Sequence, residues 1–378
     1  MRPLLTASGP RVILGSRPTV DGLAQSIVPG RAALFGPRCA VLNPITGALA
    51  VSDTGHHRLL IWRDTPERDY ADADLQIGQK DFASEGRNGK AAVGRASLNV
   101  PTGVATDGKR LAVADAWNHR VLIWSSWPDK SNQPADLVLG QKDFTGGEAN
   151  RGAFVAGADT LNWCYGVSFI AGGIAVADTG NRRVLFWNHI PTENGQPADV
   201  VLGQSDFTVR DEGAGQTSGP IGMRWPHAIA DDGARILVAD AGNNRIMAWE
   251  RGHVVSGAPC SFVLGQKDAI AVEHNRGRYL PDERALNMPY GLCVSGDFLI
   301  ATDTANSRVV GWSIDTLGPD APASALSGQP HFGAKGDNRW RAAERDSVCW
   351  PYTVTAAGGV AVIADSGNNR VLLWEVTK

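Results

Sequence analysis

One string of residues returns six times along the chain, and this repeat restricts the possible fold more than any other feature. Each copy is an apolar run that ends in Asp, followed by a tight turn, an Arg, a second apolar run and a Trp. The copies occupy residues 51–62, 113–124, 176–187, 238–249, 301–312 and 363–374. Successive turn aspartates lie 62 or 63 residues apart, at Asp53, Asp115, Asp178, Asp240, Asp303 and Asp365. A fixed period of this length indicates a repeat architecture.

The repeats cover nearly the whole chain. A chain of 378 residues would ordinarily form about two or three domains. Uniform repeats bury their faces only against their neighbours, so we predict a single domain over residues 1–378.

Charge and cysteine content exclude several classes of protein. The net charge of −3 gives no overall basic field for nucleic acid. No apolar run approaches the roughly 20 residues that span a bilayer, and the first residues lack the apolar stretch of a secretory signal. Five cysteines without a Cys-x-x-Cys spacing favour free thiols in a reducing compartment. We therefore expect a cytoplasmic monomer that does not interact with a membrane.

Each repeat contains four short apolar runs bounded by Gly, Pro, Asn or Asp, which is typical of four strands. The first begins at a Pro-x-Gly-Val segment such as 101–104, the next two form the Asp-turn-Arg hairpin, and the fourth ends in Gly-Gln, as at 140–141. Six such units predict an all-β, six-bladed β-propeller of four-stranded antiparallel blades. The last unit lacks its fourth strand, and residues 10–18 match that strand's pattern. We expect this N-terminal segment to complete the sixth blade and close the ring, which removes an open edge.

These motifs resemble those of the NHL-repeat proteins, and all six units match over about residues 10–376. The Gly-Gln-x-Asp-Phe step is similar to that of a bacterial branch of the family. The resemblance implies a six-bladed propeller. It leaves function open, because family members bind proteins or RNA or act as lyases or hydrolases.

Residues present in every blade are expected to hold the blades together, whereas a site should use positions that differ between blades. The hairpin Asp and Arg and the closing Trp are of the first kind. The position after the first-strand Pro, which should face the mouth of the central channel, differs from blade to blade. With the position before the Pro and one hairpin residue, it gives the candidate binding residues Arg38, Trp117, Trp163, Tyr165, Trp225, His227, Tyr290, Trp350 and Tyr352. Trp, Tyr and Arg are common in ligand pockets and at partner interfaces. The tryptophans could instead pack beneath the long loops as a second core.

Catalysis finds less support in the same positions. His227 is the one His of the predicted ring, no Asp or Glu joins it, and no metal site or cofactor is predicted. A lyase or hydrolase would use His227 as general base and Arg38 as an electrophilic clamp. Four thiols near the mouth could bind a soft metal, but buried, inert thiols are the simpler reading; they are Cys39, Cys164, Cys293 and Cys349.

The long connections between blades form a third candidate surface. They span 82–98, 144–161, 207–223, 269–286 and 332–348, with Asn at a repeated offset (Asn88, Asn150, Asn275, Asn338). The Asn could contact a partner or simply hold each loop to its blade. Acidic and basic residues alternate in the last two loops, which does not favour binding of single-stranded RNA. The leading hypothesis is a scaffold that binds a protein partner or a small ligand at its aromatic-lined top face.

Overall fold

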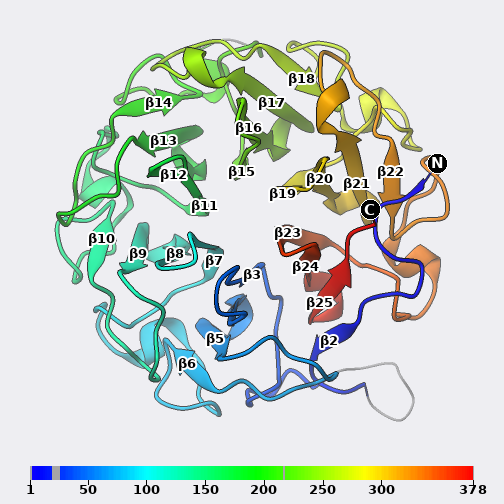
Figure 1. Cartoon of the computed structure of the whole chain (residues 1–378). Helices are drawn as coiled ribbons and strands as arrows, with labels where there is room; N and C mark the ends of the chain where they lie inside the picture. The colour runs from blue at the N-terminus through cyan, green and yellow to red at the C-terminus, as the bar shows by residue number, and fades with distance from the viewer. Residues whose placement is uncertain (1, 19–25, 216–217, 378) are drawn as a thin grey trace.

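The computed structural model describes residues 2–18, 26–215 and 218–377, and its strands form six sheets arranged around a central axis (Figure 1). Blade 1 consists of β3 (Cys39–Leu42), β4 (Leu49–Asp53), β5 (Arg58–Trp62) and β6 (Leu75–Ile77). Blade 2 consists of β7 (Pro101–Thr106), β8 (Leu111–Asp115), β9 (Arg120–Trp124) and β10 (Leu137–Leu139). Blade 3 consists of β11 (Cys164–Ile170), β12 (Gly173–Asp178), β13 (Arg183–Trp187) and β14 (Val200–Leu202).

The second half of the ring repeats this pattern. Blade 4 consists of β15 (Pro226–Asp231), β16 (Arg235–Asp240), β17 (Arg245–Glu250) and β18 (Phe262–Leu264). Blade 5 contains β19 (Pro289–Ser295), β20 (Phe298–Asp303), β21 (Arg308–Ser313) and β22 (Ala325–Ser327). Blade 6 contains β23 (Pro351–Ala357), β24 (Val360–Asp365) and β25 (Arg370–Glu375). The predicted all-β, six-bladed propeller is confirmed, and the helices of the described residues are short 3-10 turns.

The N-terminal segment completes blade 6, as the sequence predicts. Strand β2 (Val12–Gly15) pairs antiparallel with β25, with Gly15 opposite Arg370. A second contact is unexpected: β1 (Arg2–Pro3) adds to β22 as a parallel fifth strand of blade 5. The first residues thus bridge the last two blades, and the two chain ends lie close together (Figure 1).

The hydrophobic core lies between neighbouring blades, because the two middle strands of each sheet are covered on both faces. The cluster between blades 1 and 2, for example, joins Ile61 and Leu75 to Val113 and Trp124. The Trp that closes each hairpin is buried in all six blades, and its indole N–H donates to a backbone carbonyl. These tryptophans therefore belong to the core between blades, as predicted.

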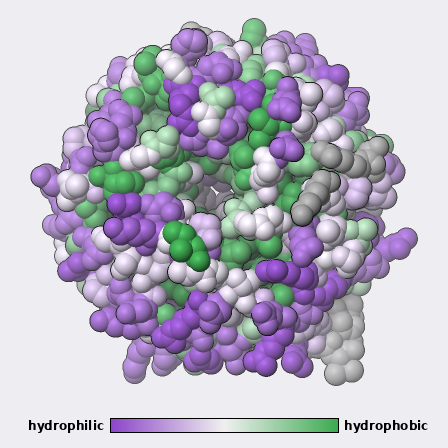
Figure 2. Space-filling model, viewed as in Figure 1, coloured by the Kyte–Doolittle hydropathy of each residue, from purple (hydrophilic) through white to green (hydrophobic). Residues whose placement is uncertain are grey.

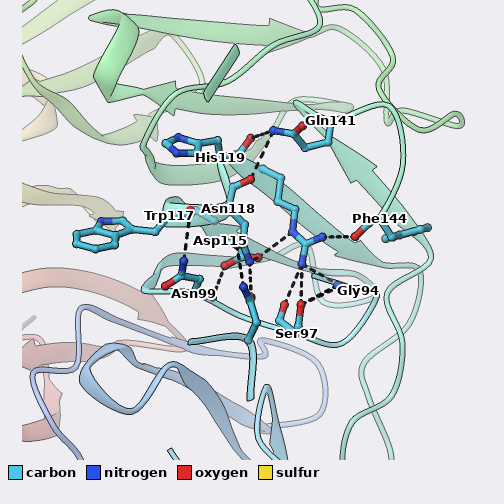
Figure 3. Close-up of polar contacts among 12 residues, drawn as sticks. Gly94, Ser97, Asn99, Asp115, Trp117, Asn118, His119, Gln141 and Phe144 are labelled. Carbon is cyan, nitrogen blue, oxygen red and sulfur yellow. Dashed lines mark hydrogen bonds and ion pairs between the residues drawn. The ribbon is translucent and has the colours of Figure 1, made fainter. Parts of the chain in front are cut away.

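The hairpin Asp and Arg form a buried ion pair in every blade. In blade 2 the Arg120 Nε lies 2.8 Å from Asp115 Oδ2, and both side chains are inaccessible to solvent. The guanidinium also donates to the carbonyls of Gly94, Ser97 and Phe144 (Figure 3). Asp115 accepts from the backbone N–H of Asn99, at the start of the same blade. Each pair thus fixes a hairpin, a long loop and the entry into the blade.

The Gly-Gln step is a structural corner as well. The Gln141 amide donates to the carbonyl of His119 in the hairpin of blade 2 (Figure 3). It also donates to the carbonyl of Glu148, which joins this hairpin to the loop that follows the blade. The preceding Gly140 has a φ of 85°, and a Cβ there would lie 2.9 Å from the His119 carbonyl oxygen. Only glycine fits such a position without strain.

Candidate functional site

The first strand of each blade lines the central channel, and its first residues lie near one mouth. Figure 2 shows a central hollow on the face in view, with hydrophobic side chains gathered around it. Within the channel, a cavity of about 300 Å³ is bounded largely by small and apolar residues of these strands. A second cavity, of about 500 Å³, lies at the mouth and shares Tyr165 and His227 with the first.

The mouth cavity brings together eight of the nine side chains that the sequence singles out. Its lining residues are Arg38, Trp163, Tyr165, Thr179, Gly180, Arg182, Trp225, His227, Tyr290, Trp350 and Tyr352. Trp117 does not line it; its ring lies instead beneath Arg87, whose Cζ is 5.1 Å from the ring centroid. The hypothesis of a mouth site therefore has a geometric basis without Trp117.

A cluster of four rings from four blades forms the centre of this site. His227 of blade 4 stacks on Tyr290 of blade 5, with ring centroids 4.4 Å apart and planes 18° from parallel. Tyr352 of blade 6 lies 4.6 Å from Tyr290, and Tyr165 of blade 3 lies 5.1 Å from His227. Ring pairs with centroids 4.4–5.1 Å apart lie within the range of favourable aromatic contacts, so the rings stabilise one another's positions.

Arg38 adds a positive charge beside these rings. Its Cζ lies 5.0 Å from the ring centroid of Tyr352 and 5.4 Å from that of Tyr165, within the range of cation–π contacts. Burial opposes the charge, but the phenols of Tyr352 and Tyr165 outweigh it and the pKa of Arg38 is raised above its usual value. Arg38 is therefore a permanent cation at the mouth.

His227 is a neutral ring at physiological pH. Burial lowers its pKa to about 4, and the Arg38 charge acts in the same direction. The Nδ1 atom lies 2.9 Å from the carbonyl oxygen of Trp225, so it carries the proton. In the neutral ring the Nε2 atom is consequently a hydrogen-bond acceptor. An imidazole that is so weakly basic is poorly suited to be a general base at neutral pH.

Two tryptophans at the rim have a left-handed backbone conformation. The φ angles of Trp163 and Trp350 are 47° and 48°. The backbone N–H of Trp163 donates to His119 Nδ1, and that of Trp350 donates to Ser307 Oγ; each acceptor belongs to the preceding blade. Val100, Met288 and Gly36 share the conformation at equivalent positions. The strained backbone is therefore part of the junction between blades rather than a feature of the mouth.

Sequence reasoning missed three lining residues, Thr179, Gly180 and Arg182, which come from the hairpin of blade 3. Arg182 occupies the hairpin position that is His57, His119, Asn244, Ser307 or Asn369 in the other blades. This departure from the repeat was visible in the sequence. That the side chain reaches the mouth cavity depends on the packing.

The Asn residues that recur at the same offset in the long loops have a structural role. Asn150 forms a reciprocal pair of side-chain hydrogen bonds with Asn181 in the hairpin of the next blade, and Asn275 does the same with Asn306. Asn88 and Asn338 form equivalent pairs with Asn118 and Asn368. These residues hold the loops to the blades, so they are not available to a partner.

The five cysteines are free thiols; two of them are buried and three are partly buried. Cys39 and Cys164 are buried, with their thiols donating to the carbonyls of Val104 and Arg120. Burial raises the pKa of Cys293 and of Cys349 to about 12. Thiols with such a high pKa are poor nucleophiles and poor metal ligands.

Among residues 2–18, 26–215 and 218–377, no three His, Cys, Asp or Glu side chains are grouped so that they could hold a metal ion. In the same part of the chain, no helix is both long enough and apolar enough to cross a bilayer.

Comparisons with known proteins agree with the fold. The family model described as NHL repeat matches residues 98–124, the entry strand and hairpin of blade 2. This match confirms an NHL repeat in blade 2, and the six sheets confirm the six-bladed propeller; the bacterial branch stays a prediction. No curated protein matches the chain in sequence.

Two solved structures are similar to this chain over most of its length. One is the hydrazine synthase of Kuenenia stuttgartiensis, with 13% identity, a TM-score of 0.51, and coverage of 91% of this chain and 96% of that one. Another is the WD40 β-propeller domain of Doa1, with 9% identity, a TM-score of 0.49, and coverage of 98% and 97%. At such identities the likeness concerns the fold alone.

Proposed function

We propose that this NHL-repeat propeller is a binding protein that takes a small, flat molecule into the cavity at its channel mouth. The observation that carries the proposal is the convergence of Arg38, Tyr165, His227, Tyr290 and Tyr352, from five blades, on one cavity of about 500 Å³. This volume is typical of sites for small organic molecules, as is a lining of aromatic rings with a few polar groups.

A protein partner is the second candidate, and the rim supports it. Trp163, Trp225 and Trp350 are each between 40% and 49% exposed. Half-exposed tryptophans around a depression are frequent anchors in protein interfaces. A partner could therefore insert a side chain into the cavity while its surface contacts the rim.

Neither catalysis nor RNA binding is favoured by the same geometry. The low pKa of His227 argues against the general base of a lyase or hydrolase. In the loops of blades 5 and 6, Arg276 and Arg339 form ion pairs with Asp320 and Asp346. These pairs reduce the charge available to a phosphate backbone. The free thiols support a reducing compartment, and we keep the cytoplasm as the proposed location.

The test is a screen of flat organic compounds that measures the rise in melting temperature of the protein. Compounds that stabilise the wild type should lose their effect in Tyr290→Ala and Trp225→Ala. They should keep it in Trp340→Ala, which removes a more exposed tryptophan that does not line the cavity. Equal stabilisation of all four proteins would place binding elsewhere and overturn the proposal.

A further inference from the structure

The side chains that line the mouth cavity carry a net positive charge. Its lining contains two arginines, Arg38 and Arg182, and no Asp or Glu among the described residues. His227 is neutral, so it neither adds to nor offsets this charge. A concave site with net positive charge attracts anions.

Both arginines also have an unused nitrogen. Arg38 Nη1 and Arg182 Nε are buried and have no hydrogen-bond partner among the described residues. In the same part of the chain, neither side chain forms an ion pair, whereas the six hairpin arginines are all paired with a carboxylate. Each guanidinium therefore lines the cavity with a charge that no carboxylate of the described residues neutralises, and an incoming anion would neutralise it.

The position of Arg182 in the repeat supports this interpretation. At five of the junctions between blades, the side chain of the equivalent residue accepts a hydrogen bond from a backbone N–H of the next blade. His119, for example, accepts from the backbone N–H of Trp163. At the junction of blades 3 and 4 the N–H of Trp225 donates instead to Asp240 Oδ1, at 3.2 Å. Arg182 is thereby released from the structural role and donates through Nη1 to the carbonyl of Arg210.

Two acids, Asp211 and Glu212, lie near Arg182, and among the described residues neither forms an ion pair with it. Glu212, which lies with Arg182 along an adjacent surface hollow, forms an ion pair with Arg224, with Nε and Oε1 3.0 Å apart. The charge of Arg182 therefore remains available on the side of the mouth cavity.

Resting on the proposed function, we infer that the ligand of the mouth cavity is a flat, largely apolar carboxylate. The guanidinium of Arg38, or that of Arg182, pairs with the carboxylate, since the planar fork of Arg matches a carboxylate in two parallel hydrogen bonds. The rings of Tyr290, Tyr352 and His227 and the rim tryptophans cover the apolar body. The Nε2 atom of His227 accepts a hydrogen bond from any hydroxyl or amine on that body.

The test compares two probes of the same shape, 2-naphthoate and the neutral 2-naphthamide, by isothermal titration at pH 7.5. We expect the wild type to bind the acid about tenfold to a hundredfold more tightly, the range that a hydrogen bond to a charged group gives. At least one of Arg38 and Arg182 pairs with the carboxylate. The preference for the acid should therefore shrink in Arg38→Met, in Arg182→Met or in both. Affinity for the amide should fall by a smaller factor than affinity for the acid. Arg110→Met, which removes an arginine of the exposed Arg110–Asp107 pair, is the matched control.

The possible outcomes distinguish a failure of this inference from a failure of the proposed function on which it rests. If the wild type binds acid and amide equally well, and Tyr290→Ala abolishes both, the anion preference is wrong and the cavity is still a binding site. If neither probe binds, both the inference and the proposed function fail for flat molecules of this size. The comparison within the wild type decides the question even where a variant does not fold.

Discussion

Two sets of arginines make the clearest contrast in this molecule. The hairpin arginines occur once in each blade, are buried, and satisfy their donors with a carboxylate and loop carbonyls, as Arg120 does. Arg38 occurs once, stands among aromatic rings, and keeps a buried nitrogen without a partner. The hairpin arginines stabilise the fold through these bonds, whereas the charge of Arg38 has no carboxylate partner among the described residues and lines the mouth cavity, where a ligand could pair with it. The contrast separates scaffold from site without any knowledge of function.

The largest effect is expected from a deletion of the segment that closes the ring. Deleting residues 1–18 takes away β1 and β2 and exposes the edge of β25. It also removes the buried Leu4, Leu5, Val12, Ile13 and Leu14. Since each buried leucine contributes about 2–5 kcal/mol, we expect loss of the cooperative unfolding transition and aggregation. Deleting residues 1–3 removes β1 alone and should lower the melting temperature much less. A stable, monomeric protein after the longer deletion would contradict ring closure by β2.

The next change tests the contrast directly. Arg120→Met leaves the Asp115 carboxylate buried without its cation, which should lower the free energy of unfolding by about 3–5 kcal/mol. Arg38→Met breaks no ion pair and should change it by less than about 1 kcal/mol. Urea unfolding of both variants measures the difference. Equal destabilisation would mean that Arg38 also belongs to the scaffold.

A smaller effect depends on pH and concerns His227. In the unfolded chain this side chain titrates near 6.5, whereas in the folded protein burial holds its pKa at about 4. Between these values the unfolded state binds more protons, so stability falls as the pH is lowered from about 6.5 to 4. The difference between the two pKa values corresponds to a loss of about 3–3.5 kcal/mol once the pH is below both. The wild type should therefore lose more stability over this range than His227→Gln. Parallel stability curves would show that His227 is not buried as a neutral ring.

The blades were predictable from sequence because their stabilising contacts are repeated. The Asp115–Arg120 pair and the buried Trp124 have counterparts every 62 or 63 residues, so six copies identify one structural unit. The closing role of residues 10–18 followed from the same period. The parallel addition of β1 did not, because two residues carry no pattern of their own.

The candidate site was only partly predictable. The position after the first-strand Pro indicated Arg38, Tyr165, His227, Tyr290 and Tyr352 as neighbours at the mouth. Trp117 was included because it departs from the usual Gly, yet it lies beneath Arg87 outside the cavity. Arg182 departs from its repeat in the same way and does reach the cavity. A residue that departs from the repeat is a candidate for the site, but whether it lines the cavity depends on the direction of its side chain.

By itself, the sequence determined the number of blades, their strands, the ion pairs that fix them and the segment that closes the ring. These features depend on local hydrogen bonding and on a period that every copy repeats. Only the tertiary structure decided which unlike side chains share a cavity and which arginines keep an unpaired nitrogen. Those properties depend on side-chain directions and on contacts between blades 60 or more residues apart, for which a single chain carries no repeated pattern.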